Sequence, residues 1–110
     1  MNIDSVFKAL ADPTRRKLLD ALRSCDGQSL SQLCAGLGLT RQGVTQHLDR
    51  LEQANLISVV WKGREKLHYL NPVPIQEIYD RWIRNYQRQH LEALQSLKNR
   101  AEGAHYIISL

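Results

Sequence analysis

Two short amphipathic segments, separated by only a few residues, constrain this chain more than any other feature. Ser29 and Gln32 form a capping-box pattern ahead of apolar residues at helical spacing. Gly36 and Gly38 end that pattern, and Thr40 is a suitable N-cap for a second segment in which apolar residues again recur at helical spacing. The sequence therefore predicts two helices joined by a tight turn, the second of which begins near Thr40.

Two further helices are expected before this pair. In residues 3–10 the apolar side chains follow an i, i+3, i+4, i+7 pattern, which places them on one helix face. Asp12 suits an N-cap and Pro13 suits the first helical position, so the next helix should run to about Arg23. Residues 25–27 are then expected to form a turn.

A β-hairpin is expected after the pair. Residues 56–61 and 66–70 are rich in β-forming side chains, and the polar link 62–65 contains a glycine. The prolines within residues 71–74 stop the second strand because proline cannot donate to a strand ladder. Helix, turn, helix and hairpin in this order predict a mainly α fold with a β-hairpin wing, a winged helix-turn-helix.

The C-terminal third of the chain carries a long apolar stripe. Apolar residues recur at helical spacing from Ile75 to Leu97, which predicts one helix of about six turns. A domain this small cannot cover so long a stripe, so the stripe is expected to meet a second copy of the chain. The residues predicted at this dimer interface are Val6 on the first helix and, on the last, Ile78, Tyr79, Trp82, Ile83, Tyr86 and Leu94.

The length of 110 residues is near the lower end of the size at which one apolar core is self-sufficient, which favours a partner subunit. We expect one domain over residues 1–102 and leave the tail 103–110 unassigned. No apolar run approaches the roughly 18 residues that span a bilayer, and residues 1–16 lack the apolar stretch of a signal peptide. The sequence therefore predicts no membrane contact and a cytoplasmic location.

The predicted helix over residues 40–53 separates apolar from polar side chains. Its apolar stripe uses Val44, Leu48 and Leu51, together with His47, which is expected to pack between helices. The other faces carry Arg and Gln, side chains that bond guanine and adenine, respectively, in two places each. Gly43 lacks a side chain, and we hypothesise that it lets the backbone come close to DNA.

A polar helix face taken alone is as readily a solvated surface as a binding surface. Its surroundings favour nucleic acid, because amides at the helix start attract phosphate and cations gather in the hairpin link. The net charge is +4, and residues 12–70 carry nine Lys and Arg against six acids. The residues predicted to contact double-stranded DNA are Thr40, Arg41, Gln42, Gly43, Thr45, Gln46, Arg50, Lys62, Arg64 and Lys66.

Three segments resemble the repressors of the ArsR family. They are residues 7–16 (Phe-Lys-Ala-Leu-Ala-Asp-Pro-Thr-Arg-Arg), residues 40–51 with Gln46-His47-Leu48, and residues 63–69, within a likeness that extends from residue 6 to about residue 72. The resemblance implies a homodimer held by the first and last helices, which binds a near-palindromic operator and represses transcription until an unidentified signal releases it. A winged-helix module that binds protein is the alternative from another class.

The positions at which relatives bind metal differ in this chain. Ser29 and Ser31 stand where the family has a Cys-x-Cys pair, and Trp82 stands where a His should follow Asp80. His90 remains, and its place on the apolar stripe predicts a packed histidine. We therefore predict no metal and no cofactor, and a metal-responsive repressor is an alternative.

Cys25 and Cys34 are expected to be free thiols because the chain shows no export signal. An oxidised pair would strain the helices around it, so a thiol-responsive repressor stays a further alternative. Tyr79, Trp82 and Tyr86 are expected to pack, with an organic-effector pocket as the alternative. No catalytic triad, phosphate loop or paired carboxylate has a supporting context, so no enzyme activity is predicted.

Overall fold

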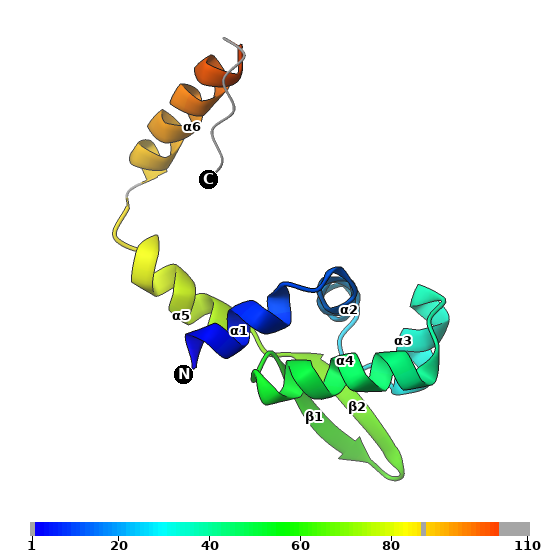
Figure 1. Cartoon of the computed structure of the whole chain (residues 1–110). Coiled ribbons are helices and arrows are strands. Elements are labelled where there is room, and N and C mark those ends of the chain that lie inside the picture. Colours follow the sequence, from blue (N-terminus) through cyan, green and yellow to red (C-terminus); the bar gives the residue numbers. More distant parts are fainter. Residues whose placement is uncertain (1, 87, 104–110) are drawn as a thin grey trace. The chain divides into compact units, whose positions relative to one another are not determined.

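Figure 1 shows the chain as a computed structural model, which describes residues 2–86 and 88–103. The elements are α1 (Ile3–Leu10), α2 (Pro13–Ser24), α3 (Leu30–Leu37), α4 (Arg41–Gln53), β1 (Ile57–Lys62), β2 (Glu65–Leu70), α5 (Val73–Trp82) and α6 (Arg88–Gly103). The chain divides into two compact units, Met1–Glu77 and Ile78–Leu110, and the boundary falls within α5. The single domain predicted over residues 1–102 therefore comprises parts of both units, and most of the predicted tail lies outside the described residues.

The first unit confirms the predicted fold class, since four helices are followed by an antiparallel hairpin. α2 and α3 begin where the sequence predicts. Asp12 Oδ1 accepts hydrogen bonds from the Thr14 and Arg15 amides at 2.8 and 3.0 Å. Ser29 Oγ accepts from the Gln32 amide at 3.3 Å, and Gln32 Oε1 accepts from the Ser29 amide at 2.8 Å. These side chains satisfy amides that have no partner within the helix.

Large aliphatic side chains from α2, α4 and the segment before β1 form the centre of the first unit. Leu18, Leu22, Val44, Leu51 and Leu56 are each 0% exposed. Burying a side chain of this size contributes about 1.5–3 kcal/mol. The inner face of α4 is therefore held against α2 and against the chain that leads into the wing.

Val6 belongs to this core. It is 1% exposed, because α1 packs against both α2 and α4. The prediction that Val6 lies at a dimer interface is therefore wrong, since a side chain without accessible surface has nothing left for a partner to cover. Its neighbour Phe7 is 42% exposed and is the large apolar side chain that α1 presents to solvent.

The hairpin is confirmed, with a shorter loop than predicted. β1 and β2 pair up to Lys62 and Glu65, which leaves Gly63 and Arg64 as a two-residue loop where the sequence predicts residues 62–65. Gly63 has φ +63°, the conformation that the first loop position of a type II′ turn requires and that glycine adopts without strain. The residues that flank this tight loop therefore lie at the tip of the wing.

The prediction of one long C-terminal helix is wrong. α5 ends at Trp82 and α6 begins at Arg88. At the end of α5 the Arg84 amide donates to Tyr79 O at 3.0 Å, five residues back, so the α-helical ladder does not continue. Asn85, a weak helix former, follows at once. None of the helices in the described ranges is long and apolar enough to cross a membrane.

The cap of α2 also makes stability depend on pH. The hydrogen bond from the Arg15 amide is the main reason why the pKa of Asp12 lies below its ordinary value. Desolvation opposes this effect, while the Thr14 amide and the charges of His47 and Arg15 add to it. The charged carboxylate therefore stabilises the fold above its unfolded pKa of about 3.9, and this contribution is lost as the pH falls through the lower folded value.

We expect Asp12→Ala to lower the free energy of unfolding at neutral pH, and its difference from wild type to shrink as the pH falls through the lowered folded pKa of Asp12. Asp12→Asn keeps a capping oxygen without the charge, so it should lose less stability at neutral pH. Urea unfolding followed by circular dichroism measures both variants. Equal losses in the two variants would show that the capping oxygen adds nothing without its charge, and no loss in either would show that the side-chain cap contributes nothing.

Candidate nucleic-acid interface

The three residues between α3 and α4 make the tight turn that the sequence predicts. Gly38 ends α3 in the left-handed conformation, with φ +64°, and its amide donates to Cys34 O. Thr40 then begins α4, since its Oγ1 accepts from the Gly43 amide at 3.3 Å. The two caps fix how α4 follows α3 (Figure 1).

α4 separates its side chains as predicted. Val44, Leu48 and Leu51 are at most 5% exposed, whereas Gln42 and Gln46 are exposed one helical turn apart. Neither glutamine amide makes a side-chain hydrogen bond with another residue in the described part of the chain. Both amides are therefore available to an external partner.

Two other predicted contact residues on α4 already have partners within the protein. Arg41 Nη1 donates to Ser31 Oγ at 2.7 Å, which links the start of α4 to the start of α3. Thr45 Oγ1 donates to Arg41 O at 2.7 Å, within the helix itself. Arg50, one turn beyond Gln46, is exposed. Arg41 and Thr45 are thus oriented before any ligand arrives.

His47 lies half-buried on the inner side of α4 and has a polar partner on α2. Its Nδ1 accepts from Arg15 Nη1 at 3.3 Å, because a guanidinium only donates. The same guanidinium donates from Nε to Ala9 O at 2.7 Å and from Nη2 to Lys8 O at 3.0 Å. Arg15 therefore connects the last turn of α1 to α4, a link that residue spacing does not reveal.

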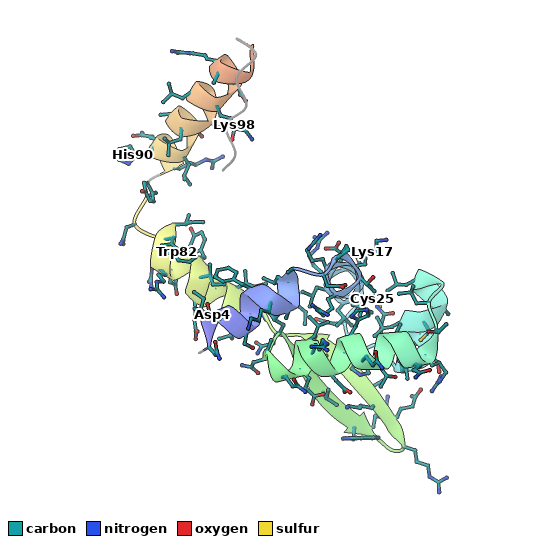
Figure 2. All side chains as sticks on the ribbon, viewed as in Figure 1. Asp4, Lys17, Cys25, Trp82, His90 and Lys98 are labelled. Carbon is teal, nitrogen blue, oxygen red and sulfur yellow. The ribbon has the colours of Figure 1, made fainter. Side chains whose placement is uncertain are left out.

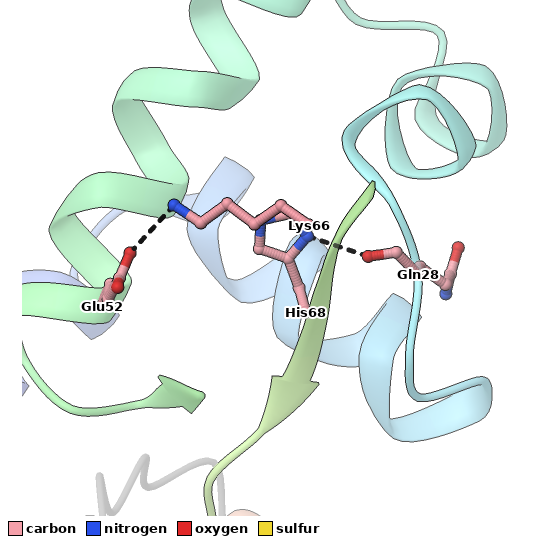
Figure 3. Close-up of polar contacts among 4 residues, drawn as sticks. All are labelled: Gln28, Glu52, Lys66 and His68. Carbon is pink, nitrogen blue, oxygen red and sulfur yellow. Dashed lines mark hydrogen bonds and ion pairs between the residues drawn. The ribbon is translucent and has the colours of Figure 1, made fainter. Parts of the chain in front are cut away.

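Two of the three predicted wing cations, Lys62 and Arg64, lie exposed at the tip. Lys66 does not stand free, because its Nζ lies 3.5 Å from Glu52 Oε2 on α4 (Figure 3). The two side chains are 38% and 46% exposed, so the ion pair contributes up to about 1 kcal/mol. Lys66 is better placed to hold the wing against α4 than to reach an external phosphate.

The other side of β2 is held by the segment that leads into α3. His68 is 3% exposed, and its Nδ1 donates to Gln28 O at 2.8 Å (Figure 3). The main chains of His68 and Gln28 also pair. The His68 amide donates to Gln28 O at 2.9 Å, and the Gln28 amide donates to His68 O at 3.2 Å. Asp26 Oδ1 accepts from the Leu70 amide at 2.8 Å. Sequence reasoning did not single out His68, whose partner lies 40 residues away.

Comparison with known proteins gives the family. A family model described as a helix-turn-helix domain matches residues 10–60. The chain is 35% identical over 88 residues to YuzN, an uncharacterized HTH-type transcriptional regulator of Bacillus subtilis, in a match that covers 74% of this chain and 96% of YuzN. It is 33% identical over 84 residues to the transcriptional repressor SdpR of the same species, over 76% of this chain and 91% of SdpR.

A solved structure of an ArsR-like transcriptional regulator from Rhodococcus matches 93% of this chain and 87% of its own, with a TM-score of 0.66 and 29% identity. The chain belongs to the ArsR family. It is a DNA-binding transcriptional regulator, as the resemblance of its sequence implies. The predictions of family, winged-helix fold and function class are confirmed.

The serines at the family's metal-binding positions have structural tasks in this ArsR-family regulator. Ser29 caps α3 and is 8% exposed, and Ser31 accepts the hydrogen bond from Arg41. Residues 2–86 and 88–103 hold no group of three or more His, Cys, Asp and Glu side chains arranged for a metal. The absence of a metal in this regulator stays a prediction.

His90 stays a prediction, whereas the free cysteines are confirmed. In the protomer His90 is exposed on α6 (Figure 2), where its ring meets that of Tyr86 edge-on with centroids 6.5 Å apart. Its packing is expected on a stripe that meets a second copy of the chain, so exposure in one protomer does not test it. Cys25 is exposed at the end of α2, Cys34 is buried, and both are free thiols, as predicted.

The glycine at the start of α4 gives a stability test. A Cβ at Gly43 would lie 3.2 Å from Thr40 Oγ1, the capping oxygen, whereas a Cβ at Gly36 of α3 would meet nothing within 4 Å. We expect Gly36→Ala to raise the free energy of unfolding by about 0.5–1 kcal/mol, the usual gain within a helix. Gly43→Ala should gain clearly less, because the cap must shift. Urea unfolding of both variants checks this, and equal gains would contradict a crowded cap.

Proposed function

We propose that this ArsR-family regulator is a homodimeric repressor that places one α4 in each of two successive major grooves of a near-palindromic operator. The observation that carries the proposal is the outer face of α4, where Gln42 and Gln46 are exposed on a helix with a capped start, and to which the exposed cations of the wing tip are added. Two such helices on one side of the duplex would be about 34 Å apart, one turn of DNA. The wings would then grip the flanking backbone.

Base reading is assigned to Gln42 and Gln46, because a glutamine amide can bond adenine in two places and discriminate by about 1–3 kcal/mol against a wrong base. Phosphate contacts are assigned to groups that surround this pair. They are the side chains of Thr40, Arg41, Thr45, Arg50, Lys62 and Arg64 and the main chain at Gly43. Lys66 is assigned the positioning of the wing, through its ion pair with Glu52.

The second unit supports the dimer. Tyr79, Trp82, Ile83, Tyr86 and Leu94 are between 39% and 52% exposed, and Ile78 is half-buried. So many large apolar side chains rarely stay in water on a soluble protomer. A second copy that brings the same surface would cover them around a two-fold axis. On α1, Phe7 takes the place that the sequence assigned to Val6.

The direction of regulation is proposed by analogy with a relative. SdpR is a transcriptional repressor. A dimer bound across its operator keeps other proteins from the same stretch of DNA, so we assign repression to this chain as well, relieved by a signal still to be identified. A DNA target also places the regulator in the cytoplasm, with the chromosome.

Removing the two glutamines should change the sequence preference of DNA binding, whereas removing the wing cations should change its overall affinity. With operator fragments selected from genomic DNA, Gln42→Ala or Gln46→Ala should reduce the preference for the operator over a mutated operator by about tenfold or more. Lys62→Ala or Arg64→Ala should weaken binding to both sequences by a similar factor. Fluorescence anisotropy measures both quantities. Equal losses on both sequences in the glutamine variants would remove the base-reading assignment.

Salt dependence is the control for the same titrations. If the dimer binds about six phosphates, the log–log slope of affinity against salt is on the order of −5. Replacing Lys62 by Ala in both subunits should make the slope less steep, by about 1 for each phosphate that the variant no longer binds. An affinity that does not change with salt would instead favour a winged helix that binds protein.

Trp82→Glu should convert the dimer to a monomer, because it places a charge in a surface that the partner would cover. Val60→Glu on the wing is the matched control, since Val60 and Trp82 are both 51% exposed and the wing lies outside the proposed interface. Sedimentation equilibrium should give a monomer for the first variant and a dimer for the second. A dimer in both would place the interface elsewhere.

A further inference from the structure

A cavity of about 280 Å³ lies within the first unit, between the start of α3, the flank of α4 that carries Arg41, Thr45 and Asp49, and the wing. The proposed DNA contacts Arg41 and Arg64 line it, but so do apolar side chains that DNA binding does not explain, Leu30, Leu48 and Trp61. The volume is close to the lower limit for sites of small organic molecules. The cavity thus combines features of a small-molecule site with part of the DNA-binding surface.

Trp61 is the most unusual part of this lining. It is 65% exposed, and within residues 2–86 and 88–103 its indole has no ring or cation stacked on it. Leu48, 5% exposed, and the half-buried Leu30 extend the apolar lining from the helices. A flat apolar group that entered the cavity could pack on the indole and on these side chains.

Two arginines among the residues that line the cavity can supply hydrogen-bond donors for an anion. Arg41 is oriented by Ser31 Oγ at 2.7 Å, an uncharged partner that leaves its positive charge in place. Arg64, at the wing tip, also lines the cavity. Neither arginine forms an ion pair with a described carboxylate within 4.0 Å. A carboxylate ligand could therefore accept two-pronged hydrogen bonds from either one.

The charged residues that line the cavity also limit how much negative charge a ligand can carry. Asp49 and Glu65 line it along with the arginines, and Lys66 is already paired with Glu52. Two carboxylates nearly balance the two guanidinium charges, so the lining has no large positive charge to hold a multiply charged anion such as a phosphate ester. A single carboxylate, with one charge and two acceptor oxygens, suits the guanidinium donors better.

His68 adds a buried polar group to the lining. It is 3% exposed, and its Nδ1 must carry a hydrogen because it is bonded to Gln28 O, which only accepts. The second ring nitrogen points away from Gln28 (Figure 3). It can accept a hydrogen bond from a donor in the cavity.

We propose that this cavity binds a small aromatic carboxylate, with its ring against Trp61 and its carboxylate bonded to Arg41 and Arg64. The bound acid weakens DNA binding, because it occupies two arginines that otherwise meet the DNA backbone. The proposal thus has two halves. The binding half, that the cavity binds the acid, concerns the protein without DNA, whereas the regulatory half, that the bound acid weakens DNA binding, rests on the proposed function.

Benzoate is the probe for binding, titrated into the full-length, ¹⁵N-labelled protein and followed by two-dimensional NMR. The Trp61 indole N–H and the Arg41 Nε–H should shift in a saturable way, with a dissociation constant on the order of 1 mM for so small a ligand. Benzamide, which has the same shape without the charge, should bind at least tenfold more weakly, and inorganic phosphate should not reproduce the shifts. The binding half is overturned if benzoate does not saturate or if either control matches it.

Two pairs of variants on the wing test whether benzoate binds in this cavity. Trp61→Ala and Arg64→Ala should each weaken benzoate binding at least tenfold, read at the Arg41 Nε–H. Val60→Ala and Lys62→Ala change exposed neighbours that do not line the cavity, and both should bind benzoate as the wild type does. Equal effects within either pair would mean that benzoate binds elsewhere, which also overturns the site.

The regulatory half is tested on the operator complex. Saturating benzoate should weaken operator binding by about tenfold relative to sodium chloride at the same ionic strength, which controls for counterion effects. The difference should vanish in Trp61→Ala. Saturable benzoate binding with unchanged operator affinity would overturn the regulatory half alone. A protein that binds no DNA would remove the proposed function, and the NMR titration would still decide the cavity.

Discussion

The burial of the inner face of α4 is the constraint on which the rest of the structure depends. Val44 and Leu51 have no accessible surface, and Leu48 has almost none. Because a helix repeats every 3.6 residues, fixing this stripe fixes the opposite one, so Gln42 and Gln46 must face outward. The caps at Gly38 and Thr40 set the start of the helix, and Arg15 adds a polar link to its inner side through His47.

The wing depends on a second set of contacts, made at its base. β2 is held on one side by the pairing of His68 with Gln28 and on the other by the ion pair of Lys66 with Glu52. A two-stranded hairpin is marginal in water without such support. Anchoring at the base lets the tip, with Gly63 in its left-handed turn, extend into solvent. The same anchoring creates the cavity, since it holds Trp61 and Arg64 opposite residues of the two helices.

The apolar residues of the second unit differ from those of the first unit in that many of them are exposed. The core of the first unit is closed by its own helices, including Val6, whereas Trp82 and Tyr86 remain about half exposed. A chain of 110 residues has a high ratio of surface to volume, so its own core cannot cover every apolar stripe. The proposed dimer would cover this one, and it would then follow from size as well as from function.

The sequence by itself determined the local structure. Asp12, Ser29 with Gln32, and Thr40 could each be recognised as helix starts, because a cap depends on residues within three positions of one another. Helical spacing likewise identified the buried and exposed faces of α4. The same spacing failed where it was extended over 23 residues, since it reports which side chains share a face and is silent on whether the main-chain hydrogen bonds continue past Trp82.

Only the tertiary structure decided which of these side chains have partners. Val6 and Phe7 are equally apolar in the sequence, and the packing of α1 on α2 and α4 buries the first and exposes the second. Lys62 and Lys66 are equally cationic, and the position of Glu52 distinguishes them. The importance of His68 depends on a carbonyl 40 residues away. Such contacts join residues that are distant along the chain, so they follow from how the elements pack and cannot be read from local pattern.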